Sequence, residues 1–149
     1  MDMIKFSLRP ATLEDSPAIE RLIHLVQINP MGLDWHRFVL AIDGSGRMLG
    51  CGQLKPHRGG IIELASIAVA PSERHKGVAS AVIEYLISRA PRPLYLTCLS
   101  SMGSFYEKWG FRRLKIKEMP GYFRRLVHLV SLMPGWSPRD DMLIVMKLM

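Results

Sequence analysis

The segment from Glu63 to Leu86 constrains the fold more than any other part of the chain. It begins with a short apolar, β-branched run that ends at Pro71, which is typical of a buried strand. Gly77 then opens a stretch with helical periodicity. Its apolar face consists of Val78, Ala81, Val82, Tyr85 and Leu86. The sequence therefore predicts a strand, a tight loop and a helix.

The loop before this helix has the features of an anion-binding site. A helix N-terminus offers unpaired backbone N–H groups and the positive end of a dipole. Gly77 has no side chain to keep an anion at a distance, and Arg74, His75 and Lys76 add positive potential. We therefore expect the loop to bind phosphate groups.

Two motifs resemble those of a known family. Arg74-His75-Lys76-Gly77-Val78-Ala79 resembles the R/Q-x-x-G-x-G/A pyrophosphate loop of the GNAT superfamily of acyl-CoA N-acyltransferases. Phe105-Tyr106-Glu107-Lys108-Trp109-Gly110-Phe111 resembles that family's F-Y-E-K-x-G-F segment, and the motifs stand in the family's order. The resemblance implies an α/β fold in one domain over residues 1–149. Its mixed, mostly antiparallel central sheet would be flanked by helices, with a parallel strand pair splayed around the coenzyme site.

Composition agrees with one globular domain. The chain has 149 residues, 48% of them hydrophobic and 22% charged, so it is neither disordered nor rich in membrane segments. No apolar run approaches the ~20 residues that a membrane helix needs. The first residues do not resemble a targeting peptide, and two isolated cysteines form no disulfide framework, so we expect a cytoplasmic protein.

The net charge of +7 allows two interpretations. Basic proteins often bind nucleic acid. However, the basic residues are spread along the chain without a nucleic-acid motif, and coenzyme A is itself a polyanion. We therefore favour coenzyme binding and regard nucleic acid as an improbable partner.

Patterns elsewhere predict the remaining elements. A first helix should begin near Asp15, with Pro17 in its first turn and Ala18, Leu22, Leu25 and Val26 buried. The expected strands are 4–8, 37–42, 48–55, 94–99, 111–116 and 142–148. Asp43 to Gly46 should form a hairpin turn. Further helices are expected at 102–109 and 122–130, turns at 56–60 and 134–138, and an irregular or short helical segment at 29–36.

The resemblance also implies how the coenzyme binds. Acetyl-CoA would be the co-substrate, with no metal, and its pyrophosphate would lie on the loop from Arg74 to Ala79. The pantetheine arm would follow the backbone of Ile67, Ala68 and Val69, with a backbone donor near the Ile67–Ala68 break facing the thioester oxygen. The family commonly has Asn seven residues before its tyrosine, where this sequence has Leu99. Ser100 or Ser101 could supply a hydroxyl in its place.

Glu63 is the carboxylate that could serve as a base. It lies in an apolar strand four residues before Ile67, and a regular strand would place both side chains on one face. Buried carboxylates rarely lack a partner. Glu63 is therefore either the base that deprotonates an amine, as acidic residues on this strand often are in the family, or a structural residue paired with Lys55, Arg58 or a neighbouring arginine.

Tyr106 is the corresponding candidate acid. On composition alone it could be a core aromatic beside Phe105, but it matches the family's tyrosine position for position. The sequence contains no serine or cysteine nucleophile motif, which fits direct attack by an amine. A thiol with a pKa of about 8.5 is already a fair leaving group, so the contribution of Tyr106 should be modest.

These features predict an N-acetyltransferase that moves the acetyl group of acetyl-CoA to a primary amine. The acceptor could be a small molecule, a peptide or a protein, a homodimer is possible, and no membrane partner is expected. The alternative is a non-catalytic module that binds coenzyme A on the same fold. The sequence does not distinguish among the possible amines.

Overall fold

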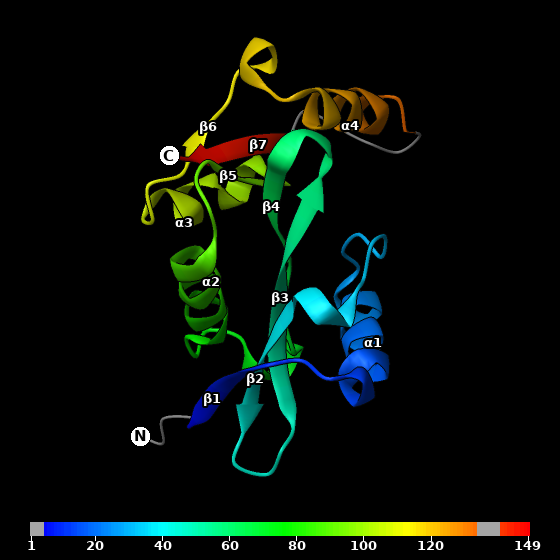
Figure 1. Cartoon of the computed structure of the whole chain (residues 1–149), viewed down its shortest axis with the longest axis vertical. Coiled ribbons are helices and arrows are strands. Elements are labelled where there is room, and N and C mark those ends of the chain that lie inside the picture. The colour runs from blue at the N-terminus through cyan, green and yellow to red at the C-terminus, as the bar shows by residue number, and fades with distance from the viewer. Residues whose placement is uncertain (1–4, 134–140) are drawn as a thin grey trace. The chain divides into compact units, whose positions relative to one another are not determined.

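The computed structural model describes residues 5–133 and 141–149. In that part of the chain, seven strands form one sheet in the order β1-β2-β3-β4-β5-β7-β6 (Figure 1). β4 and β5 pair in parallel, whereas the pairs β1–β2, β2–β3, β5–β7 and β6–β7 are antiparallel. The predicted mixed, mostly antiparallel sheet is therefore confirmed.

Contacts between residues divide the chain into two compact units. The first unit comprises Met1–Lys55 and Leu64–Ala90, and the second comprises Pro56–Glu63 and Pro91–Met149. The chain passes between them within strands β3 (Met48–His57) and β4 (Ile61–Val69) and after helix α2 (Val78–Arg89). A single domain over residues 1–149 stays a prediction.

The first unit is built on an antiparallel meander of β1 (Phe6–Pro10), β2 (Phe38–Asp43) and β3. Asp43 closes the β2–β3 hairpin, because its Oδ1 accepts hydrogen bonds from the N–H groups of Ser45 at 2.9 Å and Arg47 at 3.0 Å. The predicted hairpin turn is therefore confirmed. β3 continues to His57, so the predicted turn at 56–60 shortens to the 3₁₀ helix Arg58–Gly60.

Helix α1 (Ser16–Val26) begins where the sequence predicted, with Asp15 as N-cap and Pro17 in the first turn. The predicted buried stripe was wrong in part: Leu25 is 63% exposed, whereas Ile19 and Ile23 are buried with Leu22. These side chains pack into a core with Phe38, Leu40, Cys51 and Ala68. The helix face is rotated from the prediction because apolar residues occupy two overlapping stripes of this segment.

Helix α2 (Val78–Arg89) follows β4 and the 3₁₀ turn Pro71–Glu73, which confirms the predicted strand, loop and helix. It buries Val78, Val82, Ile83 and Leu86. Gly52 of β3 permits this packing: a Cβ there would lie 2.6 Å from Ile67 Cδ1 and 2.8 Å from Val82 Cγ1. Any side chain at Gly52 would therefore displace the helix from the sheet.

The second unit contains β5 (Leu94–Leu99), α3 (Gly103–Glu107), β6 (Arg112–Arg113), α4 (Gly121–Ser131) and β7 (Leu143–Leu148). β5 pairs with β7 along its whole length and with β4 at Ile62–Leu94 and Glu63–Tyr95. The core of this unit consists of Tyr95, Leu114, Met119, Phe123 and Val145.

Several predicted bounds need correction. The strand expected at 111–116 is reduced to Arg112–Arg113, because a 3₁₀ turn at Ile116–Glu118 follows, in which Glu118 Oε1 accepts the Lys115 N–H at 2.9 Å. The segment 29–36 contains only the start of the 3₁₀ helix Trp35–Arg37. Ile4 of the first predicted strand and the turn at 134–138 lie outside the described residues.

Candidate functional site

The loop between β4 and α2 has the backbone geometry of an anion-binding site. Gly77 is the N-cap of α2 with a φ of +84°, and His75 has a φ of +65°. No described side chain caps this 12-residue helix. A Cβ built on Gly77 meets no atom within 4 Å, so the N-terminus of α2 faces open space. Its first N–H groups, at Val78 and Ala79, can therefore bind an anion.

The charge around this loop is smaller than the sequence suggested. Arg74, His75 and Lys76 are all exposed. However, the Lys76 ammonium lies 3.2 Å from the carboxylate of Glu73, which is buried and also 3.4 Å from the Arg47 guanidinium. Glu73 thus holds the loop to the β2–β3 hairpin and neutralises part of its positive charge. Arg74 and the helix dipole remain as attractions for phosphate.

Strand β4 contains one irregular residue, Ser66, whose φ of +58° is left-handed. Such a conformation costs a non-glycine residue roughly 1 kcal/mol or more, so the surroundings must hold it. Gln53 does so: its side chain is fully buried, and its Nε2 donates to Ser66 Oγ at 2.8 Å and to the Gly32 carbonyl at 3.2 Å. Gln53 Oε1 has no partner among the described residues. Sequence reasoning missed this network, because serine gives no signal for a left-handed position.

The left-handed Ser66 changes one prediction. The argument that put Glu63 and Ile67 on one face assumed a regular strand, and Ser66 removes that assumption. The buried Cys51 thiol donates to the Ser66 carbonyl at 3.7 Å, and burial raises the pKa of this thiol to about 12. Ile67, Ala68 and Val69 stay predicted coenzyme contacts, and the Ala68 side chain lies in the core.

Glu63 is buried and has a partner that the sequence did not indicate. Its Oε1 lies 2.7 Å from Nε2 of His57, and both side chains are about nine-tenths buried. Neither Lys55 nor Arg58 pairs with it among the described residues, and Lys55 instead donates to the Met31 carbonyl at 3.1 Å. The structural alternative for Glu63 was therefore wrong in its partners. Sequence reasoning missed His57, because the pairing depends on how β3 and β4 meet across the turn Arg58–Gly60.

The His57 ring is held by helix α4. It stacks on Tyr122 with ring centroids 3.8 Å apart and meets the edge of Phe123 at 5.9 Å. Burial raises the pKa of Tyr122, and the charge of Glu63 raises it further. A carboxylate and an imidazole are thus fixed side by side next to two aromatic rings of α4.

Tyr106 lies in α3 and is buried within an aromatic cluster of Phe105, Trp109 and Phe111. Burial raises the pKa of Tyr106 to about 12, with a smaller contribution from the nearby Cys98 thiol. The phenol therefore keeps its proton at neutral and moderately alkaline pH. It can donate a hydrogen bond, but it gives up its proton less readily than an exposed tyrosine.

Ser100 is tied to the chain's own groups. Its hydroxyl donates to Asp141 Oδ1 at 2.7 Å and accepts the Met142 N–H at 3.2 Å, while Asp141 also accepts the Ser101 N–H. Leu99, at the position of the family's asparagine, is 41% exposed. A role for Ser100 in holding the coenzyme stays a prediction, and it would require this hydroxyl to exchange or share a partner.

The predicted site residues fall in both compact units. The strand and loop residues from Ile67 to Ala79 belong to the first unit, whereas Glu63, Ser100 and Tyr106 belong to the second. Within the second unit the structure brings Glu63 together with His57 and Tyr122. Within the first it brings Ser66 together with Gln53 and Gly32.

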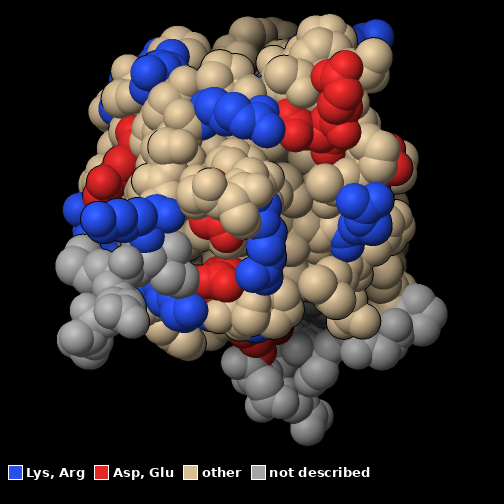
Figure 2. Space-filling model, turned by 90° about the horizontal axis from the view of Figure 1, so that it is seen from below, with Lys and Arg blue, Asp and Glu red and all other residues tan. Residues whose placement is uncertain are grey.

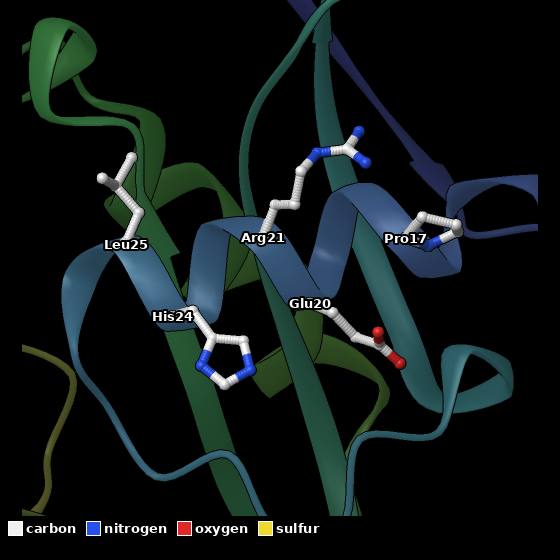
Figure 3. A pocket seen from close by; sticks show the side chains of 5 residues that line it. All are labelled: Pro17, Glu20, Arg21, His24 and Leu25. Atoms are coloured by element: carbon white, nitrogen blue, oxygen red, sulfur yellow. The ribbon is translucent and has the colours of Figure 1, made fainter.

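Two other surface features lie apart from the predicted site residues. A hollow of about 740 Å³ lies over the outer face of α1 and is lined by Pro17, Glu20, Arg21, His24 and Leu25 (Figure 3). All five come from one helix, and none is a predicted site residue. Figure 2 shows Lys and Arg side chains separated by uncharged and acidic residues on the face in view, without a continuous basic surface there.

The described residues contain no group of three or more His, Cys, Asp or Glu side chains placed to hold a metal ion. None of their helices combines the length and apolar character needed to cross a membrane.

Solved structures share this fold. The gonococcal N-acetylglutamate synthase in complex with coenzyme A and N-acetyl-glutamate matches 99% of this chain at 20% identity and a TM-score of 0.73. This chain spans only 36% of that synthase. Rv2747 from Mycobacterium tuberculosis, in complex with CoA and NLQ, matches 96% of this chain and 99% of its own at 19% identity and a TM-score of 0.73. A GNAT-family acetyltransferase from Staphylococcus aureus matches 97% of this chain over 100% of its own length, at 17% identity and a TM-score of 0.67.

The sequence comparisons identify the family. No curated protein matches the chain significantly. The model of the acetyltransferase (GNAT) domain matches residues 34–113, which is more than half of the 149 residues and includes both motifs singled out above. The chain therefore belongs to the GNAT acetyltransferases.

Proposed function

We propose that this protein is an N-acetyltransferase that moves the acetyl group of acetyl-CoA directly to a primary amine. The observation that carries the proposal is the open N-terminus of α2 at Gly77, in a loop that matches the family's pyrophosphate motif. The coenzyme's phosphates would bind the backbone from Gly77 to Ala79 and the exposed Arg74. Proteins of this fold that were crystallised with coenzyme A support coenzyme binding in general.

The chemistry would use Glu63 as the base and Tyr106 as the acid. The amine must lose a proton before it attacks, because alkyl ammonium groups have a pKa near 10.4. The buried Glu63 contacts His57 at 2.7 Å, which supports proton transfer at this position. Tyr106 would hydrogen-bond the leaving sulfur. We expect the reaction to take place in the cytoplasm, on a small molecule or on a peptide or protein amine.

The alternative is a module that binds coenzyme A without turnover. The two hypotheses differ in one measurement, which is the release of thiol from acetyl-CoA in the presence of amines. A panel should contain amino acids, polyamines, aminoglycosides, lysine peptides and peptides with different N-termini. Thiol release above the no-amine rate supports an enzyme. Coenzyme binding by calorimetry without release for any amine would support the non-catalytic module.

Glu63→Gln tests the base. Turnover should fall at neutral pH and recover in large part at alkaline pH, because the amine then loses its proton to solvent. If the carboxylate were only structural, its loss would instead lower the melting temperature and reduce activity by the same factor at every pH. A pH–rate profile and a thermal melt of both proteins distinguish these outcomes, and a constant activity ratio from neutral to alkaline pH would contradict the assignment.

A further inference from the structure

The contact between His57 and Glu63 determines which nitrogen of the imidazole carries the proton. His57 ends β3, Glu63 is the third residue of β4, and the turn Arg58–Gly60 joins the two strands. An ionised carboxylate offers acceptors alone, so a separation of 2.7 Å requires a proton on His57 Nε2. With Nε2 as donor to Glu63, Nδ1 of a neutral imidazole is left with its lone pair. The carboxylate thus selects the tautomer and fixes the ring.

Two aromatic rings of α4 pack against the imidazole that Glu63 contacts. Tyr122 covers one face of the imidazole, and Phe123 presents a ring at 5.9 Å and 75°. Both come from α4, so the ring is held between the β3–β4 turn and this helix. Besides Tyr95, which contacts Phe123, the other titratable or charged groups on β3, β5, α4 and the turn are Cys51, Lys55, Cys98, and the exposed Arg58, Arg124, Arg125 and His128.

Two atoms of the pair could receive a proton: Nδ1 of His57 and the second carboxylate oxygen of Glu63. An imidazole is ordinarily a stronger base than a glutamate carboxylate by about two pKa units. A proton on the ring also creates an ion pair with the adjacent carboxylate. A proton on the carboxylate instead removes the negative charge that pairs with the ring. Both effects favour the ring, so the carboxylate is better suited to orienting the base than to being it.

We infer that His57, oriented by Glu63, takes the proton from the acceptor amine. The inference rests on the proposed acetyl transfer and refines its base. One N–H bond of the ammonium breaks and an N–H bond forms at His57 Nδ1, directly or through water, while the electron pair stays on the amine nitrogen. That pair forms the C–N bond to the acetyl carbon, the C–S bond breaks, and the thiolate takes the proton released by the new amide. His57 then returns its proton to solvent.

His57→Gln is the decisive variant. A glutamine amide can still donate a hydrogen bond toward Glu63, but it has no basic nitrogen. We expect kcat/KM at neutral pH to fall roughly 100-fold, the low end for general-base catalysis, with recovery at alkaline pH and unchanged coenzyme affinity. Glu63→Gln should lose less of its kcat/KM at neutral pH, because the imidazole of His57 remains in that variant. His128→Gln is the matched control, since it removes an exposed imidazole of α4 outside this pair and should retain the wild-type pH profile.

Several outcomes would overturn the inference. They are a wild-type pH profile for His57→Gln, or a larger neutral-pH loss for Glu63→Gln than for His57→Gln. If His57→Gln does not fold, His57→Asn serves in its place. The tautomer gives a readout that does not need activity: nitrogen-detected NMR of the wild-type protein should show Nε2–H at His57, and Nδ1–H would refute the orientation. A protein that binds coenzyme A but acetylates no amine would refute the proposed function alone.

Discussion

Replacing Gly77 by aspartate tests the coenzyme site most directly. Gly77 caps α2 with a φ of +84°, and a Cβ there meets nothing within 4 Å. A new side chain therefore clashes with no part of the protein and projects into the open space where we place the pyrophosphate. Two costs follow, one from the backbone and one from the charge, and a matched Gly77→Asn variant separates them.

The backbone cost is shared by both variants. A left-handed conformation costs an L-residue roughly 1–2 kcal/mol, and asparagine and aspartate tolerate it better than most. The charge acts in the aspartate variant alone. One negative charge about 5 Å from a pyrophosphate with about two negative charges is repelled by about 1.7 kcal/mol even at the dielectric constant of water. That energy corresponds to roughly 15-fold weaker binding, and a lower effective dielectric constant increases it.

Calorimetry with coenzyme A on the three proteins measures both costs. We expect a modest loss for Gly77→Asn and at least a roughly 15-fold further loss for Gly77→Asp, shrinking as salt is added. Thermal melts should show similar stability for the two variants. Equal affinities of the aspartate and asparagine variants would refute the placement of the phosphates at this helix N-terminus.

Two further substitutions test other residues. Tyr106→Phe should lower kcat by roughly tenfold, about 1.4 kcal/mol in barrier terms, at unchanged coenzyme affinity, since the ring remains; a wild-type rate would show that Tyr106 only packs. Asp15→Asn should reduce stability at neutral pH by about 1 kcal/mol, because the Arg9 guanidinium, at 2.7 Å, lowers the pKa of Asp15 in the folded state. The stability advantage of the wild type is fully present above the unfolded pKa of about 3.9 and is lost as pH falls through the lower folded pKa. Urea melts of the wild type and of Asp15→Asn should therefore differ at pH 7 and nearly coincide near pH 2.

Local patterns predicted most of the fold, and tertiary contacts decided the rest. The strand, loop and helix around Gly77 were predictable because their signals are short-range: an apolar run, a proline, a glycine and a helical stripe. The buried face of α1 was not, because Ile19 and Leu25 lie on overlapping apolar stripes. Only packing against the sheet chooses between such stripes, and it buried Ile19.

The candidate site also has one part that the sequence predicts and one part that it does not. The coenzyme loop follows from residue types at fixed spacing, so sequence motifs identify it. The partner of Glu63 does not, because it depends on how β3 and β4 meet across Arg58–Gly60, where Gly59 and Gly60 have φ values of +79° and +75°. The left-handed Ser66 is stabilised by Gln53, thirteen residues earlier in the chain. Such stabilisation is a property of the folded neighbourhood, and no local signal reveals it.

The proton transfers of the proposed reaction are unequal, and this inequality predicts which residue controls the pH dependence. Burial raises the pKa of Tyr106 to about 12, whereas a thiol has a pKa of about 8.5. Full transfer from phenol to thiolate is therefore uphill by about 3.5 units, or roughly 5 kcal/mol, so Tyr106 acts mainly through a hydrogen bond to the sulfur. That contribution does not change until the phenol ionises. The loss in Tyr106→Phe should thus be the same factor at pH 6 and pH 9, while the loss in His57→Gln shrinks over this range. If both losses shrink together, the amine and sulfur steps are not separated between these two residues.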